Sequence, residues 1–192
     1  MLVDSHCHLD FKDFEGELDD VVARASEAGV GTMVSISTHL SKFEGVKAVA
    51  ERFDNVWCSV GVHPHQAGEE GVDTPDRLIE LAAHPRVVGI GESGLDYFYD
   101  RSPRDRQQIS FRAHIAAARE TGLPLIVHAR DADDDAAAIM REEMEQGACT
   151  AVMHCFSSGR GLAEAALDMG MYISFSGILT FRNAEELRNI AR

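Results

Sequence analysis

Histidine and glutamate side chains follow several short apolar runs in this sequence, and their types are those that bind divalent cations. One such run leads into His6-Cys7-His8, and three later runs each lead into a single donor. The candidate metal ligands are His6, His8, Glu92, His128 and His154. Because one polar side chain after another stands at the end of an apolar run, the pattern predicts strands that converge on one metal site, as in a metal-dependent hydrolase.

The spacing within this set suggests how the ligands divide. In a strand, residues two apart point to the same side, so His6 and His8 can bind one cation. A carboxylate at Glu92 can bridge this cation to a second one, which we assign to Glu92, His128 and His154. The alternative for any single histidine is a core residue bonded to the backbone. The bridge falls to Glu92 because the sequence has only three lysines, none beyond position 47, which excludes a carboxylated lysine on a later strand.

Two further histidines, His63 and His65, flank Pro64 after another apolar run. No additional carboxylate accompanies them. We therefore interpret them as catalytic residues, together with Glu92, that grip a substrate phosphate or supply a proton, rather than as metal ligands. The remaining histidines lie in predicted loops or helices, and we interpret all three as surface residues without a role: His39, His84 and His114.

Three arginines lie where a phosphate group could be bound. Arg101 and Arg104 follow the run that ends at Glu92, and Arg130 follows His128 by two residues. They could clamp phosphates that flank a scissile bond, or they could be solvated residues paired with nearby aspartates. The aromatic residues 97–99 could stack on bases or pack over the rim of a barrel. The acidic run 131–135 is interpreted as helix capping.

Composition limits the class of protein. The chain has 192 residues, 45% of them hydrophobic, and a formal net charge of −14. This charge argues against nucleic-acid binding through bulk electrostatics, but not against a nuclease, since bound cations invert the local field. No apolar run is long enough to span a membrane. The four cysteines show no CxxC spacing and the start lacks a signal-peptide pattern, so reduced thiols and a cytoplasmic location are expected.

These side chains need a scaffold that brings strand ends together, and the sequence shows a regular alternation of strands and helices. The predicted strands cover about 1–4, 32–37, 56–62, 87–92, 124–128, 150–155 and 171–176. The predicted helices cover 16–28, 41–53, 75–83, 104–121, 131–146, 160–169 and 183–191. We expect a single α/β domain over residues 1–192, a (β/α)8 TIM barrel with seven strand-helix units present and the eighth missing. An open barrel-like sheet or a doubly wound sheet is the alternative.

Six motifs together resemble the TatD family of metal-dependent deoxyribonucleases. They are Asp4-Ser-His-Cys-His-Leu-Asp10, Gly61-Val-His-Pro-His65, Gly89-Ile-Gly-Glu-Ser-Gly-Leu-Asp-Tyr97, His128-Ala-Arg130, His154-Cys-Phe-Ser157 and Ser174-Phe-Ser-Gly177. The resemblance implies two divalent metal ions, usually Mg²⁺ or Mn²⁺ with Zn²⁺ as an alternative, on the five ligands named above. It also implies substrate-side roles for His63 and His65. The family carries a further aspartate on the eighth strand that this sequence lacks, and without it we expect an under-liganded second metal.

The sequence therefore predicts an enzyme that hydrolyses DNA phosphodiester bonds by two-metal water activation. The resemblance points to a 3′–5′ exonuclease acting on single-stranded 3′ ends. Two alternatives remain open at this point. One is an amidohydrolase or aminoacyl-tRNA deacylase on the same barrel, and the other is an inactive barrel that binds metal without turnover.

Overall fold

Strands and helices alternate along residues 1–192, all of which the computed structural model describes. The strands are β1 (Leu2–Cys7), β2 (Val30–Ser35), β3 (Val56–Val60), β4 (Val87–Asp96), β5 (Leu125–Arg130), β6 (Ala151–Met153) and β7 (Tyr172–Ile173). The helices are α1 (Leu18–Glu27), α2 (Phe43–Arg52), α3 (Ala67–Glu70), α4 (Asp76–Ala82), α5 (Arg104–Thr121), α6 (Asp133–Gln146), α7 (Arg160–Asp168) and α8 (Glu185–Ile190). Short 3₁₀ turns are η1 (Lys12–Phe14), η2 (Leu40–Lys42), η3 (Pro64–Gln66) and η4 (Gly177–Thr180).

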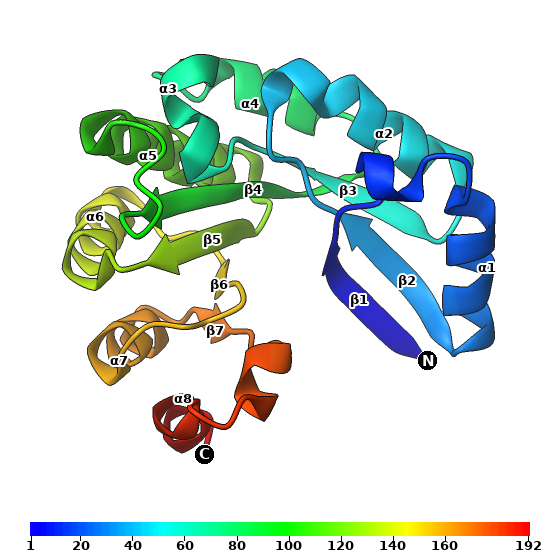
Figure 1. The fold of residues 1–192 in the computed structure, drawn as a ribbon. Coiled ribbons are helices and arrows are strands. Elements are labelled where there is room, and N and C mark those ends of the chain that lie inside the picture. Colours follow the sequence, from blue (N-terminus) through cyan, green and yellow to red (C-terminus); the bar gives the residue numbers. More distant parts are fainter.

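The strands form one parallel sheet in which each strand pairs with the next in sequence, in the order β1-β2-β3-β4-β5-β6-β7. A doubly wound sheet reverses its order at a switch point, so that alternative is wrong. The sheet curves as part of a barrel with the helices outside it (Figure 1). This is the predicted α/β fold of TIM-barrel type with seven strands, and β1 and β7 form its two edges. None of the helices is long and apolar enough to cross a membrane.

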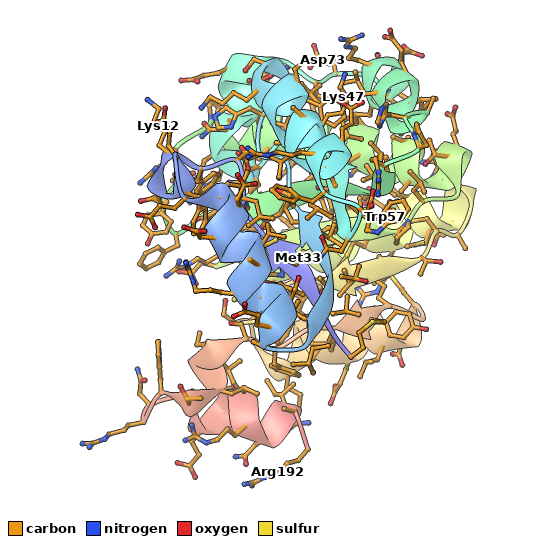
Figure 2. The ribbon with its side chains drawn as sticks, turned by 90° about the vertical axis from the view of Figure 1, so that its right-hand side faces the viewer. Lys12, Met33, Lys47, Trp57, Asp73 and Arg192 are labelled. Carbon is orange, nitrogen blue, oxygen red and sulfur yellow. The ribbon has the colours of Figure 1, made fainter.

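Apolar side chains fill the layer between the sheet and the surrounding helices. Figure 2 shows α1 and α2 lying across β1, β2 and β3, with Met33 of β2 beneath them. Met33 is buried together with Val22 of α1 and Val46 of α2 in one large core cluster. Helix α5 adds Phe111 and Ile115, both fully buried, against the centre of the sheet. Burial of this layer fixes the sheet in place, and therefore the positions of the strand ends.

Strand β4 is longer than the sequence predicted. The expected strand ended at Glu92, whereas β4 continues to Asp96, and nine of its ten residues are buried. Helix α5 occupies the predicted range 104–121. The short helix α3 was not predicted, because its four residues are too few to show a helical period. The extension of β4 matters most, since it carries a second acidic side chain, that of Asp96, beyond Glu92.

The acidic run 131–135 does not cap α6 in the way that the sequence suggested. No side chain caps this helix at its N-terminus. The carboxylate of Asp133 instead accepts a hydrogen bond from the backbone N–H of Gly159, just before α7, at 2.9 Å. Asp135 accepts a hydrogen bond from the Tyr97 hydroxyl at 2.7 Å. These acids therefore connect α6 to its neighbours.

All four cysteines are free thiols, but only Cys58 is fully buried. Burial raises the pKa of the Cys7 thiol to about 12, and nearby Asp4 and Asp10 add to this shift. Burial likewise raises the pKa of Cys58 to about 12. Both thiols are therefore protonated near neutral pH, when they are poor nucleophiles and poor metal ligands.

Candidate metal centre

Glu92 is the central residue of a cluster of imidazoles at the carboxyl ends of the strands. It lies within the buried part of β4 and is 4% exposed. Its burial raises the pKa of the carboxyl, but contacts with His128 and His6 and the charge of His63 outweigh this and hold the pKa well below its usual value. Glu92 is therefore a carboxylate at all physiological pH values, and its two oxygens face different histidines.

The first group around Glu92 combines it with His6 and His8 from β1 and the residue after it. The Nε2 atom of His6 lies 3.2 Å from Glu92 Oε2, yet this buried nitrogen has no hydrogen-bond partner. His8 Nδ1 lies 3.2 Å from the carbonyl oxygen of Ile36, to which it donates, so His8 Nε2 keeps a free lone pair. Burial, together with the charge of His6, lowers the pKa of His8. Each ring therefore has a ring nitrogen without a hydrogen-bond partner that it can offer to a cation next to Glu92.

His128 from β5 approaches the other oxygen of Glu92. Its Nδ1 lies 3.0 Å from Glu92 Oε1, and its Nε2 lies 3.0 Å from Oδ2 of Asp96. Although burial lowers the pKa of His128, its hydrogen bonds to the two carboxylates raise the pKa to about 9. Without metal, His128 is therefore a cation that donates from both nitrogens. A metal ion can take the place of the proton on Nδ1.

His63 completes a second group with Glu92 and His128, whose donor atoms lie within 4.8 Å of one another. Its hydrogen bonding nevertheless argues against metal ligation. His63 Nδ1 accepts the backbone N–H of His65 at 3.2 Å, so the neutral ring carries its proton on Nε2. Burial lowers the pKa of His63 to about 3, which keeps the ring neutral. Its Nε2–H, 3.9 Å from Glu92 Oε1, is thus a hydrogen-bond donor directed into the centre.

His154 lies beside the first group. Its ring stacks on that of His6, with centroids 3.2 Å apart and planes inclined by 5°. It lines the same cavity as the other histidines, but it belongs to neither of the two groups of clustered donor atoms. The predicted combination of Glu92, His128 and His154 around a second cation therefore stays a prediction, although the structure does bring all three side chains to one cavity.

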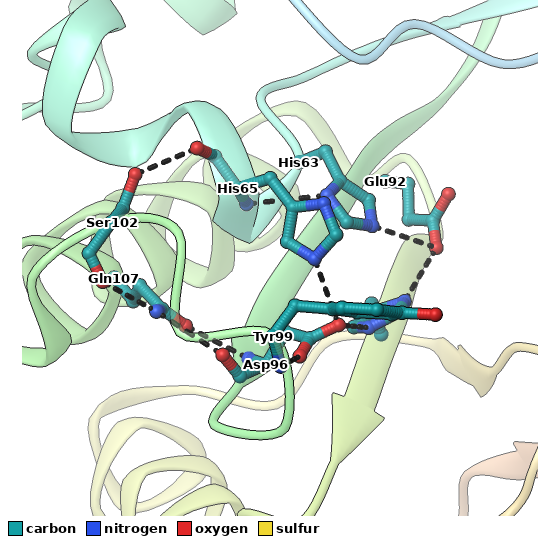
Figure 3. A network of polar contacts seen from close by, with 8 residues as sticks. His63, His65, Glu92, Asp96, Tyr99, Ser102 and Gln107 are labelled. Carbon is teal, nitrogen blue, oxygen red and sulfur yellow. Dashed lines mark hydrogen bonds and ion pairs between the residues drawn. The ribbon is translucent and has the colours of Figure 1, made fainter.

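Sequence analysis did not identify Asp96, which is fully buried at the end of β4. Its Oδ2 atom lies 2.9 Å from His65 Nε2 and 3.0 Å from His128 Nε2. Figure 3 shows Asp96 below the ring of His65. Its Oδ1 atom accepts the backbone N–H of Tyr99 at 2.8 Å. A sequence signal did exist, because Asp96 is four residues after Glu92 and falls on the same face of an extended strand.

Two of the three predicted phosphate-binding arginines line the cavity. Arg101 and Arg130 both face it, and neither forms an ion pair with an acidic side chain. Arg130 lies over the rings of Phe98 and Tyr99, 4.2 and 4.8 Å from their centroids. Arg104 differs: its guanidinium pairs with Asp100 and packs on Tyr97, outside the cavity lining. The position of Arg104 does not support a phosphate contact.

Two of the histidines that we interpreted as surface residues are placed differently by the structure. His114 of α5 is completely buried, so its interpretation is wrong. Its Nε2 accepts the backbone N–H of Val62 at 3.0 Å, while Nδ1 donates to the carbonyl of Ser110 at 2.7 Å. His39 lines the mouth of the cavity. Only His84 lies at the surface as expected, where it pairs with Glu51.

Glycines allow the strands to approach closely beneath the centre. A Cβ atom on Gly61 of the loop after β3 would collide with the backbone of Gly91, and one on Gly91 would lie 2.6 Å from the carbonyl oxygen of Ile126. Their small size lets β3, β4 and β5 approach closely, which brings His63, Glu92 and His128 together.

The cavity has a volume of about 770 Å³ and is open to solvent. Its lining contains the imidazoles and Glu92 together with Arg101 and Arg130. A buried imidazole nitrogen without a partner, at His6, beside a carboxylate is the arrangement expected of residues that bind a divalent cation. Lys47, which pairs with Glu44 at 2.6 Å on α2, does not line this cavity. The donor set therefore fits one or more divalent cations.

Comparison with known proteins agrees with this geometry. A family model described as "TatD related DNase" matches residues 3–192. The metal-dependent hydrolase YcfH of Escherichia coli K12 is 47% identical over 194 residues, a match that covers all of this chain and 72% of YcfH. A protein of Klebsiella pneumoniae named 3′-5′ ssDNA/RNA exonuclease TatD is 33% identical over 190 residues, covering 98% of this chain and 72% of that protein.

A solved structure shows the same fold. The crystal structure of YJJV, a TatD homologue from Escherichia coli, superimposes with a TM-score of 0.85 at 30% sequence identity. The match covers 98% of this chain and 73% of the other. Together with the cluster of histidines around a buried carboxylate, these likenesses show that the chain belongs to the TatD family of metal-dependent hydrolases.

Proposed function

We propose that this protein hydrolyses phosphodiester bonds of nucleic acid, with single-stranded DNA 3′ ends as its substrate and two Mg²⁺ or Mn²⁺ ions as cofactors. The observation that carries the proposal is the pair of arginines without acidic partners, Arg101 and Arg130, which line the same cavity as Glu92 and its histidines. In a chain with a net charge of −14, unpaired cations at one cavity favour an anionic substrate. The name of the Klebsiella relative supports the same substrate class.

The chain supplies distinct groups for each part of the reaction. His6, His8, Glu92 and His128 would hold the metal ions, with His154 beside them. Bound divalent cations would lower the pKa of a water and polarise a phosphate oxygen. All remaining chemistry comes from the protein's own side chains, which bind the substrate and move protons.

A second set of side chains can act on the substrate. Neutral His63 can donate its Nε2–H to a non-bridging phosphate oxygen. His65 donates Nε2–H to Asp96, which leaves Nδ1 as the nitrogen that can take or return a proton. Arg101 and Arg130 can pair with flanking phosphates. The exposed rings of Phe98 and Tyr99, which are 55% and 48% exposed, offer faces for base stacking.

A degradation assay tests the proposal. A single-stranded DNA oligonucleotide labelled at its 5′ end, incubated with Mg²⁺ or Mn²⁺, should give a ladder that shortens from the 3′ end. Glu92→Gln should lower the rate by at least about 100-fold, because it removes the central carboxylate. The matched control is Glu44→Gln, a change at an exposed glutamate on α2 that pairs with Lys47.

Arginine variants test the substrate class within the same assay. Arg130→Ala should raise KM about tenfold or more through loss of a charged contact, while Arg104→Ala should leave KM unchanged. Parallel incubations with RNA, a cyclic amide and an aminoacyl-tRNA separate the other hydrolase reactions. Hydrolysis of an amide or of aminoacyl-tRNA without cleavage of any nucleic acid would overturn the proposal.

The four free thiols further support a reducing compartment, the cytoplasm, as the site of action.

A further inference from the structure

The side chain of Asp96 contacts both His65, which we propose acts on the substrate, and His128, which we propose binds metal. A single oxygen, Oδ2, accepts hydrogen bonds from the Nε2 atoms of His65 and His128, at 2.9 and 3.0 Å. His128 also faces Glu92, whereas His65 lines the same cavity and contacts no carboxylate other than Asp96. No other carboxylate of the chain contacts both of these rings.

Hydrogen bonds hold both the side chain and the backbone of Asp96 in place. Its Oδ1 accepts the backbone N–H of Tyr99 at 2.8 Å. Its backbone N–H donates to Gln107 Oε1 at 2.8 Å, and the same glutamine donates to the carbonyl of Ser102 at 2.8 Å. The Ser102 hydroxyl in turn donates to the carbonyl of His65 at 2.8 Å. Figure 3 shows that this network joins the backbone of His65 to that of Asp96.

We propose that Asp96 is a positioning residue that fixes the tautomers and orientations of His65 and His128 together, and so couples metal binding to the substrate side of the cavity. By accepting a hydrogen bond from the Nε2–H of His128, Asp96 keeps the proton on Nε2 and leaves Nδ1 as the ligand nitrogen. By accepting a hydrogen bond from the Nε2–H of His65, it leaves Nδ1 of that ring to exchange a proton with the substrate. Asp96 does not touch the substrate and lies outside both groups of clustered donor atoms.

The electrostatics of the site agree with this role. Burial raises the pKa of Asp96, but its hydrogen bonds from His128, from the Tyr99 N–H and from His65 outweigh burial and lower the pKa. The group is therefore an acceptor only, with no proton of its own to donate. An asparagine at this position cannot replace it: with its carbonyl oxygen facing the two rings, its NH₂ group would face the Tyr99 N–H, a donor against a donor, and it would carry no negative charge.

The first test measures metal affinity, which does not depend on the proposed substrate. Titration of the metal-free protein with Mn²⁺ should show affinity lowered about 10- to 100-fold by Asp96→Asn. In a His128→Ala background, the same substitution should change the remaining affinity by less than about threefold, since Asp96 acts through that ring. Asp135→Asn is the matched control, a carboxylate that also accepts two hydrogen bonds but lies outside the centre.

The second test rests on the proposed hydrolysis. With saturating Mn²⁺, Asp96→Asn should lower kcat and leave KM within about twofold, and the loss should largely disappear in a His65→Ala background. If wild-type protein cleaves no nucleic acid, the proposed function fails while the metal titration still decides the role of Asp96. Wild-type Mn²⁺ affinity in Asp96→Asn, or an equal loss with and without His128, would overturn the role.

A spectroscopic measurement covers the case in which Asp96→Asn does not fold. In the Mg²⁺-loaded wild-type protein, long-range ¹H–¹⁵N spectra should show a protonated Nε2 and an unprotonated Nδ1 for both His65 and His128. The opposite tautomer at either ring would contradict the inference, because Asp96 would then have no proton to accept from it.

Discussion

Substitutions at His114 test the hydrogen bonding and the charge state of this buried histidine beneath the metal centre. His114 is fully buried in α5, and its side chain forms two hydrogen bonds, with the Val62 N–H and with the Ser110 carbonyl. Burial lowers its pKa from 6.5 to about 4, although the bond to Ser110 opposes the shift. The contact with Val62 matters for function because Val62 directly precedes His63.

Proton linkage gives the size of the expected change in the free energy of unfolding with pH. A group whose pKa is lower in the folded than in the unfolded state contributes its full stability above the unfolded pKa and loses it as pH falls towards the folded value. At pH 5.5 an unfolded histidine is about nine-tenths protonated, while folded His114 is almost neutral. The free energy of unfolding should therefore fall by about 1.4 kcal/mol between pH 8 and pH 5.5 through this group alone.

The assay compares variants at these two pH values. Urea unfolding of the metal-free protein, followed through the fluorescence of the single tryptophan, Trp57, gives the free energy of unfolding. His114→Leu leaves the Val62 N–H without an acceptor and should cost about 1–3 kcal/mol at pH 8. At pH 5.5 the gap to wild type should shrink by about 1.4 kcal/mol, because leucine does not titrate.

His114→Gln is the matched control for the hydrogen bond. Its amide oxygen can accept the Val62 N–H, so its cost at pH 8 should be smaller than that of leucine, while its pH dependence should equal that of the leucine variant. Other histidines titrate in all three proteins, and their contribution cancels in the difference. A gap between wild type and His114→Leu that stays constant from pH 8 to pH 5.5 would refute the reasoning.

Backbone packing and thiol chemistry give two further predictions. Gly94→Ala should destabilise the protein by about 3 kcal/mol and weaken Mn²⁺ binding, because its φ is +145° and a Cβ atom would collide with the carbonyl of His128. Gly45→Ala, with open space around it on α2, should instead stabilise the protein by about 0.5–1 kcal/mol, measured by the same urea unfolding assay. Alkylation of native protein by iodoacetamide at pH 8, read by peptide mass spectrometry, should spare Cys7 and Cys58; rapid labelling of either would contradict its burial.

The scaffold was predictable because its signals are local and repeated. Continuous apolar runs marked each buried strand, and glycines such as Gly122 marked helix ends, so the parallel sheet followed from alternation alone. Residues at strand ends, such as Glu92 and His128, could then be placed at one edge of the sheet. The end of β4 was harder to predict, since Gly94 interrupts the apolar run before Leu95 and Asp96.

The roles of the individual histidines were not predictable, because each role depends on which ring nitrogen already forms a hydrogen bond within the protein. In the sequence, His63 and His128 each come after an apolar run. In the structure, however, a backbone N–H donates to Nδ1 of His63. Asp96 occupies Nε2 of His128 and leaves the opposite nitrogen facing Glu92. His114 could have been identified, since it is three residues after Phe111 and four before Ala118 on the buried face of a helix.

The charges of the centre explain why two buried carboxylates lie so close together. Glu92 and Asp96 are both ionised, and without metal the His128 imidazolium lies between them and compensates part of their charge. A cation bound in place of the Nδ1 proton would leave His128 neutral and would place the positive charge beside Glu92. The Nε2–H groups of His65 and His128 would still donate to Oδ2 of Asp96. Both lone pairs of that oxygen are then occupied, so the residue to which sequence analysis gave no role orients ligands without being one.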